Sequence, residues 1–179
     1  SYQFVTIQDT TAFLQGASIA FDDTVIYEGS YVSSRYTVDV QNVEQRFLIN
    51  DDRVDTTTLT VTVQNSISDS TLTTYTLATD ISGLTSTSNV YFLQEVEDGK
   101  YEIYFGDGIL GSLVEDGNIV IMNYVVTNKG AANSAAVFTS SSAIDTVNSV
   151  NVRLVSPAAG GAEPESIESI KYNAPLDYA

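Results

Sequence analysis

Three aspartate–glycine pairs divide residues 91–124 into short apolar runs, and this pattern constrains the fold more than any other feature of the chain. The pairs are Asp98-Gly99, Asp107-Gly108 and Asp116-Gly117. Glycine reaches positive φ at little steric cost, and aspartate accepts hydrogen bonds from its own downstream backbone, so each pair marks a place where the chain can reverse. The runs between the pairs are therefore predicted to be β-strands joined by tight turns.

Two of these runs also predict how each strand is covered. Residues 100–105 alternate in character, and successive residues of a strand point to opposite faces. The core-facing side chains are expected to be Tyr101, Ile103 and Phe105, and the outward ones Glu102 and Tyr104. Residues 118–126 are apolar on both faces apart from Asn123, which indicates a central strand covered on both sides.

Period-two runs rich in threonine, valine and tyrosine recur along the chain, as expected for strands. They cover residues 34–40, 59–64, 70–77 and 150–155. Their core-facing side chains are expected to be Tyr36, Val38, Val40, Leu59, Val61, Val63, Val152 and Leu154. Because the polar segment 65–69 has the length of a hairpin loop, residues 59–64 and residues 70–77 are predicted to pair antiparallel. The predicted fold class is all-β, an antiparallel β-sandwich-like domain.

A change of composition towards the C-terminus predicts a second domain. Residues 1–155 are assigned to a β-sandwich-like structural domain, and residues 156–179 to a linker and the start of a helical segment of the next domain. Pro164 suits the first helical position, and the acidic side chains around it complement the positive N-terminus of a helix. Such a short helix is not stable alone, so it should dock on the sandwich, on another chain or on a missing continuation. The missing continuation is favoured, so the helix is expected to lead into a missing domain of a longer polypeptide. Residues 130–142, which are rich in small side chains, are predicted to form a long loop or an irregular edge segment.

Three segments of the chain, in the right order, resemble one known family. They are a strand, acidic loop and strand at residues 47–64, the glycine-punctuated strands at residues 91–111, and a glycine pair with an acidic helix at residues 160–175. These segments are similar to the baseplate wedge ring proteins of T-even-type contractile-tailed phages, which are related to the baseplate J-like family. The first forty-odd residues take no part in the resemblance.

The resemblance implies a structural, non-enzymatic component of a contractile tail baseplate. It implies assembly through protein–protein contacts into the wedge ring around the tail tube, with other copies of the chain and other baseplate wedge proteins as partners. The implied location is the virion, at the tail baseplate, after assembly in the host cytoplasm. The resemblance identifies no interface residue. It fixes turns and core strands instead, and its fold-marking turn motif is formed by Phe105, Gly106, Asp107, Gly108 and Gly111.

The charge of the chain excludes several kinds of partner. The formal net charge is −16, from 23 acidic and 7 basic residues, and the basic residues are scattered singly. Binding to nucleic acid or to an anionic membrane needs clustered lysine or arginine, so neither is expected. No stretch approaches the roughly 20 apolar residues of a membrane span, and the first residues lack the pattern of a signal peptide.

The residue types present also limit the chemistry. Histidine and cysteine are absent, which removes the common general base, the common nucleophile systems and the usual zinc ligands. Glu95, Glu102 and Asp107 remain as carboxylates for glycoside hydrolysis, but this needs two of them about 5 to 9 Å apart in a sugar-binding cleft. The absence of tryptophan argues against such a cleft. No catalytic, cofactor-binding or metal-binding residue is therefore assigned, and no small-molecule substrate is expected.

Two other patterns have structural interpretations. Gly106-x-Gly108-x-x-Gly111 matches a dinucleotide fingerprint, but Asp116-Gly117 follows too soon for the helix that the fingerprint must open. Tyr101, Tyr104 and Tyr124 are interpreted as core and cross-strand packing residues, although an outward row of tyrosines would suit a protein interface.

A second class of function stays open, a secreted or surface β-module that binds carbohydrate or calcium. Asn50, Asp51, Asp52 and Asp55 form a local group of oxygen ligands, which hard cations prefer. The spacing lacks the alternation of a dedicated calcium loop, so a polar turn is the simpler interpretation. If calcium does bind there, adding it at millimolar levels or below should raise the melting temperature.

Overall fold

The computed structural model describes residues 1–42, 45–141, 143–144 and 150–174 of the chain. It divides into two compact units, Ser1–Thr127 and Asn128–Ala179. The predicted division between residues 155 and 156 stays a prediction. Residue 142 of the predicted loop and the last five residues of the predicted second domain lie outside the described residues.

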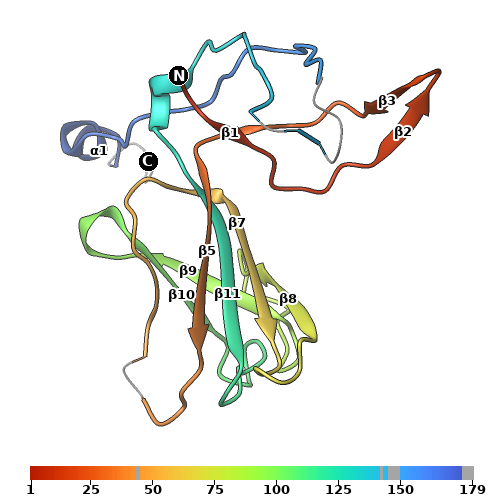
Figure 1. Cartoon of the computed structure of the whole chain (residues 1–179). Coiled ribbons are helices and arrows are strands. Elements are labelled where there is room, and N and C mark those ends of the chain that lie inside the picture. The colour runs from red at the N-terminus through yellow and green to blue at the C-terminus, as the bar shows by residue number, and fades with distance from the viewer. Residues whose placement is uncertain (43–44, 142, 145–149, 175–179) are drawn as a thin grey trace. The chain divides into compact units, whose positions relative to one another are not determined.

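A seven-stranded sheet dominates the first unit (Figure 1). Its strands, in spatial order, are β5 (Ser30–Thr37), β11 (Ile119–Val126), β7 (Val54–Gln64), β8 (Leu72–Leu77), β9 (Val90–Glu95), β10 (Tyr101–Phe105) and β6 (Phe47–Ile49). All neighbouring pairs are antiparallel except β8 and β9, which residues 78–89 join by the longer connection that a parallel pair needs. The prediction of an all-β, sandwich-like fold is confirmed.

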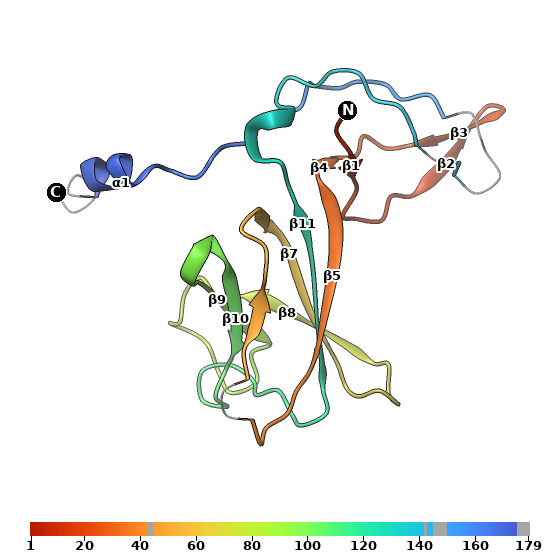
Figure 2. The same ribbon diagram turned by 60° about the vertical axis from the view of Figure 1, so that its left-hand side comes forward.

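The sheet curls until its two edge strands meet. The Tyr36 hydroxyl of β5 donates a hydrogen bond of 2.7 Å to the Leu48 carbonyl of β6, and the Tyr36 and Phe47 rings pack edge to face at 5.8 Å. Figures 1 and 2 show β5, β11 and β7 side by side in one layer, with β9 and β10 in the other. The result is a nearly closed, barrel-like sandwich with one core.

Replacing Tyr36 by phenylalanine tests this closure. The variant keeps the ring but removes the hydroxyl that joins the edge strands, so we expect it to lower the free energy of unfolding by about 1 kcal/mol in urea denaturation. Tyr31 lies on the same strand and is 50% exposed, so Tyr31→Phe should change stability by less than about 0.5 kcal/mol. Equal effects of the two substitutions would contradict the closure.

Side chains from both layers form the core. The most deeply buried are Ile49, Val61, Ile103, Met122, Val120 and Val125. Phe105 joins the layers, because its ring packs edge to face on Phe47 at 5.5 Å and on Tyr75 at 5.2 Å. The predicted inward positions of β7 and β10 are confirmed, since Leu59, Val61, Val63 and Ile103 are buried and Tyr101 and Phe105 pack against the core.

The central position predicted for residues 118–126 is confirmed. Strand β11 pairs with β5 on one side and with β7 on the other. Val120, Met122 and Tyr124 belong to the core cluster, while Ile121 and Val125 are buried on the opposite face. A strand with both faces covered must be mainly apolar, and Asn123 is the one plainly polar residue of β11.

Strand β7 is longer than predicted, because it continues through an irregularity. Asn123 pairs with Thr60 but Val125 pairs with Asp55, so the ladder breaks between them. The Thr58 hydroxyl fills the break, accepting from the Val125 amide at 2.9 Å and donating to the Asp55 carbonyl at 2.7 Å. Thr58 is 3% exposed, so its side chain replaces a missing ladder bond inside the protein.

The predicted hairpin between β7 and β8 is confirmed, with Val61 opposite Tyr75. In its turn the Asp69 carboxylate accepts hydrogen bonds from the Asn65 side chain at 2.8 Å and from the Thr71 amide and hydroxyl at 3.0 and 2.7 Å. These bonds, that from Asn65 foremost, lower the pKa of Asp69 from its ordinary value of 3.8 to about 2.

The turn therefore makes stability depend on acid pH. Because the pKa of Asp69 is lower in the folded state, its contribution is complete above pH 3.8 and disappears as the pH falls to about 2. We expect Asp69→Asn to be less stable than the unmodified chain at pH 7 and equally stable near pH 2, as measured by urea denaturation. Asp9→Asn, at an exposed aspartate, is the control. A difference at pH 7 that persists unchanged near pH 2 would contradict the role of the carboxylate.

Two expectations about β-structure were wrong. Strand β5 ends at Thr37, and Val40 is 51% exposed because the chain turns at Asp39, whose carboxylate accepts from the Gln41 amide at 3.0 Å. Residues 150–155 form no strand, and Val152 and Leu154 are 43% and 41% exposed. An alternating sequence forms a strand only where a neighbouring strand completes its hydrogen bonds, and no described strand pairs with this segment.

The described residues of the second unit have little regular structure. A short 3-10 helix, η2 (Lys129–Ala132), is followed by irregular chain, as predicted for residues 130–141. Asn133 joins the segment that follows η2 to the segment around Gly161. Its side chain donates to the Gly161 carbonyl at 2.7 Å and accepts from the Gly161 amide at 3.1 Å. The helix α1 (Ile167–Asn173) begins later than Pro164, because Ser166 is its N-cap and accepts from the Ser169 amide.

The N-terminal segment forms two small sheets of its own. The strands β1 (Phe4–Val5) and β4 (Tyr27–Glu28) pair antiparallel just before β5 begins. Between them, β2 (Ala12–Gln15) and β3 (Ser18–Phe21) form a hairpin that shares no strand pairing with the seven-stranded sheet. We call residues 12–21 the N-terminal hairpin.

Candidate functional site

The glycine turn, formed by Phe105, Gly106, Asp107, Gly108 and Gly111, lies where β10 ends. One oxygen of the Asp107 carboxylate accepts from the amides of Ile109 and Leu110, both at 2.9 Å. The bonds from Leu110 and Ile109 lower the pKa of Asp107 below its ordinary value. The Gly108 amide donates to the Gly111 carbonyl at 3.1 Å and closes the turn. Asp107 thus caps its own loop.

Glycine is required at position 106 by the close approach of the two ends of the turn. A Cβ atom there would lie within 3.0 Å of backbone atoms of both Gly111 and Leu110. Gly111 has a φ of +92°, which disfavours other residues as well. Backbone atoms cannot move aside as a side chain can, so the turn depends on both positions.

The turn also holds the connection between β8 and β9. The Gly111 amide donates to the Thr85 carbonyl at 3.0 Å, and the Ser112 amide donates to the Ser88 carbonyl at 2.8 Å. The Ser112 hydroxyl donates to the Asn89 side chain at 2.9 Å. Sequence reasoning missed Ser112, whose only signal was a small hydroxyl residue directly after the last glycine. The use of these five residues as markers of a family fold stays a prediction.

The three candidate acidic residues are not brought together. Glu95 lies opposite Tyr101 in the β9–β10 ladder, whereas Glu102 lies opposite Gln94, so the two glutamates point to opposite faces of the sheet. Glu102 forms an ion pair with Arg46, and Asp107 is engaged by its own loop. The arrangement offers no pair of facing carboxylates for hydrolysis among these three residues.

The acidic loop at residues 50–55 is also occupied by its own chain. Asp51 accepts from the Arg53 amide at 2.9 Å and forms an ion pair with the Arg53 guanidinium at 3.2 Å. Asp55 accepts from the amide and hydroxyl of Thr57 at 3.0 and 2.6 Å. Within the described part of the chain, no group of three or more acidic, histidine or cysteine side chains is arranged to hold a metal ion.

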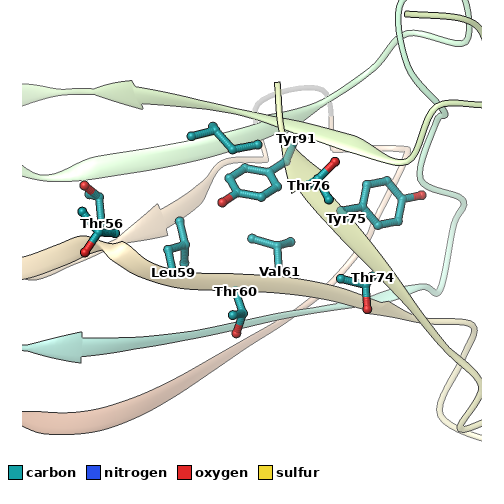
Figure 3. A pocket seen from close by; sticks show the side chains of 10 residues that line it. Thr56, Leu59, Thr60, Val61, Thr74, Tyr75, Thr76 and Tyr91 are labelled. Atoms are coloured by element: carbon teal, nitrogen blue, oxygen red, sulfur yellow. The ribbon is translucent and has the colours of Figure 1, made fainter. Parts of the chain in front are cut away.

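An open groove follows the line where β7 and β8 separate (Figure 3). Leu59, Val61 and Tyr91 face one another there, while Thr60 points away from them on the other side of β7 (Figure 3). The wall is otherwise mostly threonine. Leu59, Val61 and Tyr91 belong to the buried core, and no charged side chain lines the groove, so the groove offers no acid–base pair for catalysis.

The three tyrosines that were interpreted as packing residues have different environments. Tyr124 is 4% exposed, and its hydroxyl pairs with the Ser34 hydroxyl at 3.0 Å. Tyr101 packs against the core, so the packing interpretation is confirmed for these two. Tyr104 is 47% exposed and stacks on Phe92, its partner on the neighbouring strand, with ring centroids 5.1 Å apart, so cross-strand packing is confirmed for it as well. This outer pair and the N-terminal hairpin are exposed apolar surfaces of the first unit.

These features define the protein as an all-β domain. Its candidate site residues form turns, local hydrogen bonds and core contacts. The chain belongs to the family described as bacteriophage baseplate wedge protein gp6, third domain, whose model matches residues 34–140. The resemblance of residues 47–64 and 91–111 is thereby confirmed, while residues 160–175 and the N-terminal hairpin lie outside the matched range.

A curated relative agrees with the family. The chain is similar to the baseplate wedge protein gp6 of Enterobacteria phage T4, with 28% identity over 109 residues. The match covers 48% of this chain and 16% of that protein. The chain thus corresponds to a small part of the relative's length.

One further finding concerns membranes. In the residues that the structure describes, no helix is both long enough and apolar enough to cross a bilayer.

Proposed function

We propose that the chain is a non-enzymatic structural domain of a contractile-tail baseplate, within the wedge. The observation that carries this proposal is the family match over residues 34–140, which takes in nearly all of the seven-stranded sheet and ends after η2. A match of this extent covers the core strands and the glycine turn together. A match to one short turn alone would not support the proposal.

The geometry of the acidic residues supports a role without turnover. The carboxylates that the sequence offers for catalysis are Glu95, Glu102 and Asp107, and they are separated by the sheet or engaged in local hydrogen bonds. The sheet and its turns hold outer surfaces in fixed positions, which is what an assembly module requires. The oxygen-rich loop at residues 50–55 supports no calcium-binding alternative, because Asp51 and Asp55 are engaged by Arg53 and Thr57.

The proposed partners are other copies of the protein and other baseplate wedge proteins, joined in the ring around the tail tube. The proposed location is the tail baseplate of the virion, after assembly in the host cytoplasm. Association would depend on buried apolar contacts, since the net charge of −16 makes close approach of two copies unfavourable elsewhere.

Co-assembly tests this proposal directly. The full-length protein would be produced together with the tail proteins encoded beside it, and complexes would be separated by size and weighed by mass photometry. We expect a stable complex with at least one of these proteins and larger, closed assemblies when all are present. A protein that stays monomeric with each of them, singly and together, would overturn the proposal.

A further inference from the structure

The N-terminal hairpin presents one wholly apolar face. In its ladder Leu14 lies opposite Ile19 and Ala12 lies opposite Phe21, and these two pairs share a face because they are two residues apart. The other face carries Phe13 and Ala20 together with the polar pair Gln15 and Ser18. Leu14 is 81%, Ile19 58% and Phe21 42% exposed. We call Ala12, Leu14, Ile19 and Phe21 the hairpin face.

Nothing within the hairpin covers the hairpin face. A two-stranded sheet is marginally stable in water unless something covers its apolar side. Its large side chains are exposed on adjacent positions and so form one patch rather than scattered single residues. Such a patch is usually buried against the surface of another protein.

The charge around the hairpin face indicates which kind of partner surface would complement it. The hairpin contains no charged residue, but Asp9 comes before it and Asp22 and Asp23 follow it directly. Residues 1–34 contain four acidic residues and no lysine or arginine. Asp9 and Asp22 are exposed. The complementary surface is an apolar groove with basic side chains at the rim that meets these aspartates.

We propose that the hairpin face docks into an apolar groove, rimmed by lysine or arginine, on a different protein of the same tail assembly. The proposal rests on the proposed function and adds to it the docking segment and the chemistry of the partner. A second copy of this chain is the wrong occupant, because its net charge is −16 and its seven basic residues are scattered singly along the sequence, so it lacks clustered lysine or arginine for the rim. A lipid surface is also the wrong occupant, since the flanking aspartates oppose approach to anionic headgroups.

The test uses a double variant in which the exposed cross-strand pair is made polar, Leu14→Ser with Ile19→Ser. The matched control makes two apolar and more exposed side chains polar elsewhere, Ile67→Ser with Ile109→Ser, at 93% and 73% exposure. Each full-length protein is immobilised and tested by biolayer interferometry against every tail protein encoded beside it, one at a time. Circular dichroism melting confirms that all forms fold.

We expect the hairpin variant to bind one partner at least about thirtyfold more weakly, as for the loss of interface anchors, while the control binds that partner normally. A third variant, Asp9→Asn with Asp22→Asn, should slow association with this partner and reduce its salt dependence. Unchanged binding of the hairpin variant to every partner would overturn the inference and leave the proposed function intact.

Two further outcomes would also overturn the inference. Self-association of the unmodified protein that the hairpin variant abolishes would identify a second copy as the occupant. Cosedimentation with phosphatidylcholine vesicles that the hairpin variant abolishes would identify a lipid surface. Failure of the unmodified protein to bind any of the tail proteins would overturn the proposed function, and this inference with it.

Discussion

Replacing Gly106 by alanine is expected to lower the free energy of unfolding by about 3 kcal/mol or more. The added methyl group would meet backbone atoms of Gly111 and Leu110 at less than 3.0 Å, and neither can rotate away. Relief would require the turn to open, which would also strain the hydrogen bonds from Gly111 and Ser112 to residues 85–88. Urea denaturation followed by tyrosine fluorescence measures the loss.

Gly117 provides the matched control for this substitution. It also lies in an aspartate–glycine turn, with a φ of +80°, but a Cβ atom there meets nothing within 4 Å. Gly117→Ala should therefore cost only the backbone strain, about 1 kcal/mol. If Gly106→Ala costs no more than Gly117→Ala, then close approach within the glycine turn does not support the fold as described.

The second large effect is expected at Met122, in the middle of β11. This side chain is fully buried in the core cluster, on the central strand of its layer. Met122→Ala would leave a cavity that the surrounding strands cannot fill, so we expect a loss of about 2 to 5 kcal/mol in urea denaturation. Met122→Leu, which nearly conserves volume, should cost less than about 1.5 kcal/mol.

An exposed position completes this comparison. Ile67 lies in the turn between β7 and β8 and is 93% exposed, so Ile67→Ala should change stability by less than about 0.5 kcal/mol. Similar losses for Met122→Ala and Ile67→Ala would show that β11 is not the covered central strand of the domain.

The sequence predicted best those strands whose pattern of apolar residues follows directly from burial. Strands β10, β11 and the β7–β8 hairpin follow from alternation, from apolar character on both faces and from a short polar turn. Val40 and residues 150–155 carry the same alternation but are exposed, because alternation shows that a segment can form a strand and not that a neighbouring strand exists.

Interactions between distant segments could not be predicted from local pattern. Thr58 replaces a ladder bond to Val125, which lies 67 residues away, and Ser112 fixes the connection at Asn89. Threonine and serine are common in β5, β7 and β8 and in many of the loops, so nothing in the sequence distinguishes these two. The parallel pairing of β8 with β9 depends in the same way on the path of residues 78–89.

The surfaces were harder to predict than the scaffold. The N-terminal hairpin contains small, polar and apolar residues mixed together, and it lies outside every segment that resembled a family. Its apolar face emerges only once the register places Leu14 opposite Ile19 and Ala12 opposite Phe21. The glycine turn, by contrast, could be located from its sequence, and its structure explains why glycine must occupy position 106.

Direct imaging of the assembled particle tests the central proposal that this chain is a structural domain of the baseplate. Tails that contain the full-length protein would be purified from infected host cells and reconstructed by cryo-electron microscopy. Density that fits the curled seven-stranded sheet, repeated around the tail tube at the baseplate, is the expected result. Purified, infectious particles that lack the protein, or that carry it only away from the baseplate, would contradict the proposal.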